Sequence, residues 1–266
     1  MSTQYTVTAT PQAEESGSVA LAVASLPASF GPVAAGDAAS ISAIDGAPGW
    51  TTEAIKAIDG GASGIVVVNP VPENTAALLD AAEAASAAVV LDQRWASNPG
   101  LAGAEDAVRS VAGRAAMLDT VATAAAGTDP ERLLTEHLAA VVRVTGQLDG
   151  LRVLRLGTHG YTVSGRFANG APVSLQGVLS NSRPAGVDFR LYTDDGGVSI
   201  AVPEPLAAWP AEVRATGPQG EILLPTLYES AHRTTWRRLK EHLDAGTLPS
   251  DLAGFARLTE SIAHLS

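Results

Sequence analysis

The chain has 266 residues, of which 46% are hydrophobic and 17% charged, a balance typical of a globular protein with room for two compact domains. Its formal net charge of −11 argues against nucleic acid and membranes as partners, because nucleic acid and anionic membranes attract basic surfaces. The absence of cysteine excludes disulfides and thiolate ligands and favours a cytoplasmic location.

The first half of the chain alternates strand-like and helix-like segments. Residues 1–18 are polar, lack the features of a secretory signal, and are expected to form a loose arm or an edge strand. Continuous apolar runs at 63–70 and 87–92 are typical of strands buried on both faces of a parallel sheet. Further strands are expected at 18–25, 40–45 and 115–123, and helices at 51–61, 72–86 and 98–114. This alternation predicts a Rossmann-like, doubly wound parallel sheet over residues 1–126.

After residues 127–130 the pattern changes to one long helix followed by strands. An amphipathic helix is expected at 131–146, and strand-like segments then follow without intervening helices. Hairpin turns are indicated at 168–170, at 194–197 and within 211–225, and the chain closes with helices at 228–246 and 250–265. Residues 127–266 are therefore predicted to form an α+β domain with an open, mostly antiparallel sheet.

Three segments, taken in order, resemble the Gfo/Idh/MocA oxidoreductases. They are the run "GIVVVNPVPENTAALLDAAEAASAAVVLDQRWASNP", the helix "LLTEHLAAVVRVTG", and the strands around "GRFANGAPVSLQG" and "RLYTDDGGVSI". The resemblance covers roughly residues 60–265. It implies a Rossmann domain followed by an α+β domain, hydride transfer between NAD(P) and a hydroxyl carbon of a sugar or cyclitol, and a homodimer or higher oligomer formed through the C-terminal sheet.

The cofactor site that the resemblance implies departs from the family pattern. A Gly-x-Gly-x-x-Gly turn is expected after the first strand, but only Gly31 and Gly36 follow the run at 18–25, so the fingerprint is absent. Asp45 ends the expected second strand, where it either binds a ribose or serves the turn. Asn69 and Pro70 match the family turn that lies under the nicotinamide ribose.

The catalytic positions depart from the family as well. Gln93 occupies the place of the lysine in the family's Glu-Lys-Pro motif, and it can hydrogen-bond a hydroxyl but supplies no charge and transfers no proton. His137 matches the histidine of the family's Asp-x-x-x-His helix, whereas Leu133 stands in the aspartate position. Gln93 and His137 are the candidate catalytic residues; the alternative for His137 is a packed or solvated helix residue that lines at most a residual pocket.

These departures leave open whether the chain is an enzyme. We favour a divergent family member with lost or impaired NAD(P)-dependent dehydrogenase activity, which serves as a small-molecule binder for a sugar-like or polyol-like ligand or as a subunit of a complex. The alternatives are an active sugar or cyclitol dehydrogenase with a non-standard cofactor loop and an unrelated α/β binding protein. The sequence shows no spacing of histidines and carboxylates that predicts a metal site.

Overall fold

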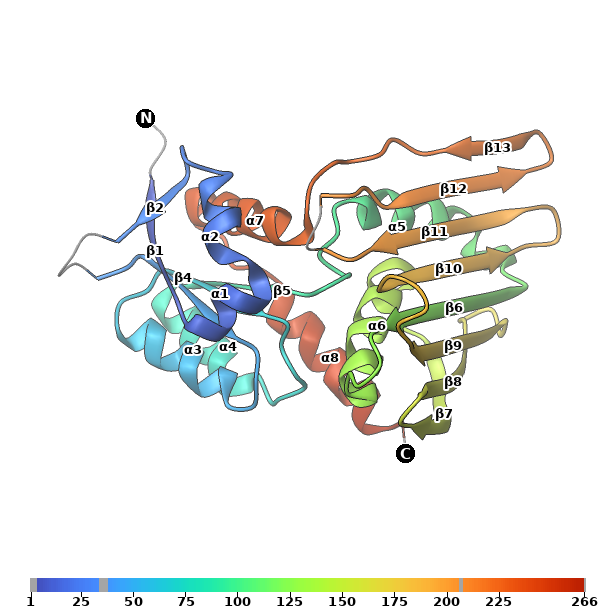
Figure 1. The fold of residues 1–266 in the computed structure, drawn as a ribbon, viewed down its shortest axis with the longest axis horizontal. Helices are drawn as coiled ribbons and strands as arrows, with labels where there is room; N and C mark the ends of the chain where they lie inside the picture. The colour runs from blue at the N-terminus through green and yellow to red at the C-terminus, as the bar shows by residue number, and fades with distance from the viewer. Residues whose placement is uncertain (1–3, 34–37, 206–207, 266) are drawn as a thin grey trace. The chain divides into compact units, whose positions relative to one another are not determined.

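A computed structural model of the chain describes residues 4–33, 38–205 and 208–265 (Figure 1). The chain divides into two compact units. The first comprises Met1–Ser97 and Ala231–Thr259, and the second comprises Asn98–Ser230 and Glu260–Ser266. Each unit is built around a sheet of its own.

The described part of the first unit contains a parallel sheet of five strands in the spatial order β2-β1-β3-β4-β5. In chain order the strands are β1 (Tyr5–Ala9), β2 (Phe30–Pro32), β3 (Ile41–Asp45), β4 (Gly64–Val68) and β5 (Ala88–Asp92). Every residue of β4 and β5 is buried, as the continuous apolar runs predicted. The helices are α1 (Pro11–Gly17), α2 (Val19–Ala24), α3 (Trp50–Asp59), α4 (Ala76–Ala85), α7 (Ala231–Ala245) and α8 (Asp251–Ala263), the last of which reaches the second unit at Glu260.

Helices pack on both faces of this sheet. On one face, side chains of α1, α2 and α7 share a core with alternate residues of the strands, and the rings of Phe30 and Trp236 lie 5.2 Å apart. The intervening residues of the strands point to the other face of the sheet. There α3 packs against β3, β4 and α4. There Trp50 of α3 meets Phe255 of α8 at 5.9 Å between ring centroids. The predicted doubly wound sheet is confirmed.

The start of the sheet differs from the prediction. Residues 18–25 were expected to form the first strand, but Val19–Ala24 form helix α2, and the first strand is β1 within the polar N-terminal segment. Val19 and Ala22 are buried whereas Leu21 is 68% exposed, which is the spacing of a helix with one buried face. A short apolar run does not distinguish a strand from a buried helix, so the prediction for this segment was wrong.

The described part of the second unit contains an eight-stranded sheet in the order β13-β12-β11-β10-β6-β9-β8-β7 (Figure 1). All neighbouring pairs are antiparallel except β6 and β9, so the open, mostly antiparallel sheet is confirmed. The strands are β6 (Met117–Ala124), β7 (Asp149–Gly157), β8 (Gly160–Arg166), β9 (Pro172–Leu179), β10 (Gly186–Tyr192), β11 (Gly197–Pro203), β12 (Glu212–Gly217) and β13 (Gly220–Leu223). Helices α5 (Gly100–Val111) and α6 (Pro130–Thr145) pack against this sheet, and a 3₁₀ turn, Ala112–Arg114, follows α5.

The division between the units differs from the predicted boundary between residues 126 and 127. Strand β6 pairs with β9 and β10 and so belongs to the second sheet, while α7, far along the chain, packs on β4 and β5 of the first. Periodicity indicates a strand or a helix but does not say which sheet it joins. No helix in the described part of the chain is long and apolar enough to cross a membrane.

Candidate functional site

The carboxyl edge of the parallel sheet is where a fold of this class binds its ligand. In open α/β sheets the ligand lies outside the carboxyl ends of the strands, where the strand order reverses. Here β1 lies between β2 and β3, so the order reverses at β1. The residues that follow the strands at this edge are Thr10 after β1, Gly46 after β3, Asn69 after β4 and Gln93 after β5.

The turn from β1 to α1 occupies the position of a dinucleotide phosphate loop, and it contains no glycine. The Thr10 hydroxyl accepts a hydrogen bond from the Ala13 N–H at 3.2 Å, and Pro11 has no N–H to offer. Glu14 adds a carboxylate to the first turn of α1. Its two oxygens lie 2.9 and 3.0 Å from the backbone nitrogen of Ala20 in α2, whose N–H they accept. With Pro11 and the capped Ala13, this turn presents fewer free backbone N–H groups than a glycine loop offers to a pyrophosphate.

This turn also corrects the predicted location of the loop. We expected it after residues 18–25, where Gly31 and Gly36 were the available glycines. Gly31 instead lies within β2, and Gly36 lies outside the described residues. The error follows from the helix α2 having been interpreted as the first strand.

The turn from β3 to α3 carries two glycines that the sequence analysis missed. A Cβ at Gly46 would lie 2.3 Å from the Cα of Pro70, so only glycine fits there. The Gly46 N–H donates to the Val68 carbonyl at 2.7 Å, and its carbonyl accepts from the Val71 N–H at 2.8 Å. The turn is thus packed against the end of β4.

The N-terminus of α3 is already occupied by a side chain of the protein. The Glu73 carboxylate accepts hydrogen bonds from the N–H of Gly49, from the N–H of Thr51 at 3.3 Å and from the Thr51 hydroxyl at 2.9 Å. The positive end of a helix dipole favours such an anion. An internal carboxylate therefore fills the place where an external phosphate would otherwise bind.

Asp45 serves the turn that follows β3. Its carboxylate accepts from the Ala47 N–H at 3.2 Å and from the Ser16 hydroxyl at 3.4 Å. The second strand along the chain is β2, which lies on the opposite side of β1 from β3. Asp45 was expected to end the second strand along the chain, but it ends the third, β3. Its contacts are those of a turn residue.

Asn69 and Pro70 lie at the centre of the edge. Asn69 has a φ of +50°, a left-handed conformation that asparagine tolerates better than most residues, and its N–H donates to the Asp92 carbonyl at 2.8 Å. The buried Oδ1 of Asn69 has no hydrogen-bond partner among the described residues. Asn69 therefore has a buried acceptor that no donor among the described residues satisfies.

The end of β5 holds a buried cluster of polar side chains. Asp92 is fully buried, and its Oδ2 lies 2.6 Å from Nδ1 of His232 while its Oδ1 accepts from the Thr235 hydroxyl at 3.2 Å. Both partners come from α7. Asp92 occupies the position of the glutamate in the family's Glu-Lys-Pro motif, and here its carboxylate anchors a helix.

Gln93 is half-buried and directly follows this cluster. Its N–H donates to the Ser97 hydroxyl at 3.0 Å, and its carbonyl accepts from the Ser97 N–H at 3.1 Å. Within the described ranges its carboxamide makes no hydrogen bond of its own, so it remains available to a ligand hydroxyl. It offers hydrogen bonds but no charge.

His137 lies in the core of the second unit. Its Nε2 is 2.7 Å from the Thr120 hydroxyl and its Nδ1 is 2.8 Å from the Tyr161 hydroxyl. The Tyr161 hydroxyl donates to the Leu133 carbonyl at 3.4 Å, so the consistent arrangement has Nδ1–H donating to Tyr161 and Nε2 accepting from Thr120. Burial lowers the pKa of His137 to about 3.

The imidazole of His137 is therefore neutral, fully buried and bonded at both nitrogens. Leu133, in place of the family's aspartate, is also fully buried. Burial raises the pKa of Tyr161 well above its ordinary value, with a smaller contribution from the nearby charge of Glu136, so the hydroxyl also stays neutral. The cluster offers no solvent-accessible base.

Four of the five predicted site residues share one edge. Asp45, Val68 and Asp92 are register partners across β3, β4 and β5, so Asp45, the Asn69–Pro70 turn and Gln93 follow neighbouring strand ends. His137 belongs to the other unit. Among the described residues, no three histidines or carboxylates are grouped so as to hold a metal ion.

Comparison with known proteins supports the fold and shows that the sequence is distant. No family model and no curated protein matches the chain. Levoglucosan dehydrogenase, solved with NADH and levoglucosan, is 12% identical, with a TM-score of 0.71 over 99% of this chain and 96% of that chain. UDP-N-acetylglucosamine 3-dehydrogenase GnnA from Acidithiobacillus ferrooxidans is 13% identical, with a TM-score of 0.66 over 95% and 86% of the two chains.

A third similar structure is KijD10, a 3-ketoreductase from Actinomadura kijaniata solved with NADP and TDP-benzene. It is 11% identical, with a TM-score of 0.69 over 98% of this chain and 88% of that chain. The protein thus has the two-part fold of sugar-nucleotide and sugar dehydrogenases. That fold is the one of the Gfo/Idh/MocA-type dehydrogenases, as the sequence resemblance indicated.

Proposed function

We propose that this chain is a divergent protein of the Gfo/Idh/MocA type in which NAD(P)-dependent hydride transfer is lost or impaired. It acts instead as a binder of a small sugar-like or polyol-like molecule, or as a subunit of a complex, in the cytoplasm. The observation that carries this proposal is the state of the carboxyl edge. Thr10 caps α1 in place of a phosphate loop, and Glu73 fills the N-terminus of α3.

The positions that serve the reaction in the family support the same conclusion. Gln93 replaces the lysine and supplies no charge, and Leu133 replaces the aspartate. His137 is held between two hydroxyls in a core, at a lowered pKa. A small neutral ligand needs none of these groups, the half-buried Gln93 carboxamide is able to bind a hydroxyl, and the buried Oδ1 of Asn69 beside it still lacks a donor.

The competing candidate is an active dehydrogenase with a non-standard cofactor loop, which the NADH and NADP complexes of the similar structures favour. Titration of the purified protein with NADH and with NADPH separates the two, with nicotinamide fluorescence and calorimetry as readouts and an active dehydrogenase of this fold as the positive control. We expect no saturable signal for either nucleotide. Saturable binding in the micromolar range would overturn the proposal.

The binding half of the proposal has a test of its own. A panel of neutral monosaccharides and cyclitols is screened by thermal shift and by ligand-observed NMR. A hit is expected to be lost in Asn69→Gly, because glycine adopts the same left-handed backbone but carries no carboxamide. Asn74→Ala, which removes a carboxamide that accepts from the Ala76 N–H, is the control.

We also propose that two copies associate through the second sheet. Helices α5 and α6 pack against one face, while Met117, Val178 and Tyr192, which alternate with buried residues along their strands, remain exposed. Exposed apolar residues on an uncovered sheet face are typical of an interaction surface. Light scattering at micromolar concentration is expected to give the mass of a dimer or larger, and a monomer would contradict this.

A further inference from the structure

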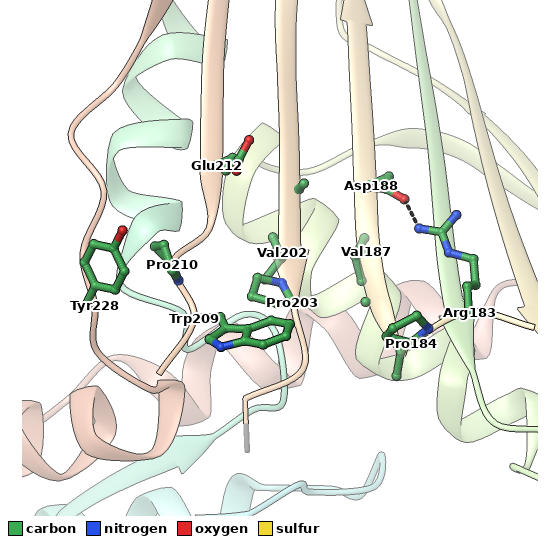
Figure 2. A pocket seen from close by; sticks show the side chains of 13 residues that line it. Arg183, Pro184, Val187, Asp188, Val202, Pro203, Trp209, Pro210, Glu212 and Tyr228 are labelled. Carbon is green, nitrogen blue, oxygen red and sulfur yellow. Dashed lines mark hydrogen bonds and ion pairs between the residues drawn. The ribbon is translucent and has the colours of Figure 1, made fainter. Parts of the chain in front are cut away.

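A groove crosses one end of the second sheet. It has a volume of about 510 Å³, which is within the range of ligand-binding pockets. The start of β10, the end of β11, the start of β12 and the residues at 209–210 and 228 line it (Figure 2). All of these segments belong to the second unit.

Prolines provide exposed apolar surface in the groove, and the backbone of the strands beneath it is already hydrogen-bonded. Val187 and Val202 are buried beneath it and are register partners in the β10–β11 ladder. Pro184, Pro203 and Pro210 lie around them and contribute no N–H group. An occupant is therefore bound by side chains and by apolar contact rather than as an added strand.

Two exposed aromatic side chains border the groove. Trp209 is 68% exposed and Tyr228 is 76% exposed, although aromatic rings of this size are usually covered. Figure 2 shows the Trp209 ring beside Pro203, and Tyr228 on the far side of Pro210. In the described part of the chain neither the indole N–H nor the phenol hydroxyl forms a hydrogen bond, so both donors are available.

The charges of the groove carry a small excess of carboxylate, which favours a basic occupant over an anionic one. Its lining holds one guanidinium, Arg183, which already pairs with Asp188 at 2.6 Å, and a second carboxylate, Glu212, which accepts from Arg214 at 3.2 Å. Each carboxylate has room for further donors. The chain as a whole has a net charge of −11, so a basic occupant is favoured over an acidic one.

We propose that this groove binds a proline-rich segment of a partner protein, flanked by arginine or lysine. A polyproline II helix makes no internal hydrogen bonds, so its carbonyls can accept from the Trp209 N–H and the Tyr228 hydroxyl. Its proline rings pack on exposed aromatic rings, as in other aromatic-lined grooves, and its basic flanks face Asp188 and Glu212. This inference does not depend on whether the protein binds a nucleotide or a sugar.

The fluorescence of Trp209 provides a direct test. The other three tryptophans, Trp50, Trp95 and Trp236, are buried, so acrylamide quenching of the full chain reports mainly on Trp209. The probe is a synthetic peptide with two Pro-x-x-Pro repeats between arginines. We expect saturable protection of Trp209, no protection by the same peptide with serine in place of proline, and weaker binding when glutamate replaces arginine.

Variants and a second ligand class complete the test. Calorimetry is expected to show binding weakened by about tenfold or more in Trp209→Ala and in Tyr228→Ala, and unchanged in Leu21→Ala, an exposed residue of α2 in the first unit. These exposed positions should leave folding intact, which circular dichroism checks. No saturable binding of the proline peptide, equal binding by Trp209→Ala, or binding of a neutral oligosaccharide in its place would overturn the proposal.

Discussion

Two buried histidines, one in each unit, lie in polar clusters of different kinds. His232 faces the carboxylate of Asp92 at the end of β5, whereas His137 is held between the hydroxyls of Thr120 and Tyr161. One cluster contains a carboxylate that needs a donor, and the other consists of groups that are all neutral. Both stand at or beside positions that carry catalytic residues in the related fold.

The difference indicates what each cluster does. A buried carboxylate is costly unless it is paired, so the Asp92 cluster holds α7 to the sheet through a strong polar contact. The His137 cluster satisfies all of its donors without any charge, and so contributes to packing in the second unit. In both clusters, the hydrogen bonds connect side chains from different secondary-structure elements.

Removing the donor to Asp92 has the largest expected effect. In His232→Ala, the buried Asp92 carboxylate loses the imidazole and keeps the Thr235 hydroxyl. This loss should lower the free energy of unfolding by about 3–5 kcal/mol. Chemical denaturation of the wild type and the variant measures this. His242→Ala on the same helix, where the imidazole meets Thr247 near the surface, should cost under about 0.5 kcal/mol.

A double-mutant cycle makes the comparison sharper. Asp92→Asn and His232→Gln are each expected to destabilise the protein. The double variant should lose less stability than the sum of the two single losses, because it contains neither the carboxylate nor the imidazole and so leaves no unpaired charge. Additive effects would show that Asp92 and His232 do not act as a pair. The cluster would then be ordinary core packing, like that of His137.

The clusters also show how much of the molecule the sequence can predict. The buried strands β4 and β5, the Asn69–Pro70 turn and the antiparallel second sheet follow from local patterns of apolar and turn residues, and the structure confirms both sheets. The pairing of Asp92 with His232, 140 residues apart, and the capping of α3 by Glu73 are long-range contacts. A single sequence carries no periodic signal for such contacts.

The same limit explains the errors. Helix α2 and a buried strand have similar apolar composition over six residues, so the first strand and the phosphate loop were both placed too late in the chain. Of the two features that were missed at the turn from β3 to α3, Gly46 has a local signal in the sequence, whereas the contact of Glu73 with Thr51 does not. A glycine directly after a strand and before a helix marks a close backbone approach, here to Pro70.

His137 predicts a dependence of stability on pH. Its folded pKa of about 3 lies below the unfolded value of 6.5, so between these values the unfolded chain binds a proton that the folded chain does not. Stability from this group is therefore complete above about pH 6.5 and is lost as pH falls, by up to about 1.4 kcal/mol per pH unit. Urea denaturation between neutral pH and about pH 4 measures the slope.

The variant His137→Gln isolates this contribution. Glutamine retains hydrogen-bonding capacity but does not titrate, so the variant should be less stable at neutral pH by about 1–3 kcal/mol and should lose less stability on acidification. His159→Gln, at an exposed position of the same unit, should retain the wild-type slope. Parallel slopes for wild type and His137→Gln would show that His137 is not the group responsible.

The smallest expected effect concerns the turn that replaces the phosphate loop. Thr10→Ala removes the side chain that caps α1 and should cost about 1 kcal/mol, whereas Thr10→Ser keeps the hydroxyl and should cost a few tenths. Thermal and urea denaturation measure both. The Ala13 N–H is released in Thr10→Ala, yet NADH binding should still not appear, because Pro11 offers no N–H and Glu14 keeps a negative charge in the first turn. Nucleotide binding gained by Thr10→Ala alone would mean that one hydroxyl, and not the whole turn, separates this edge from a working cofactor site.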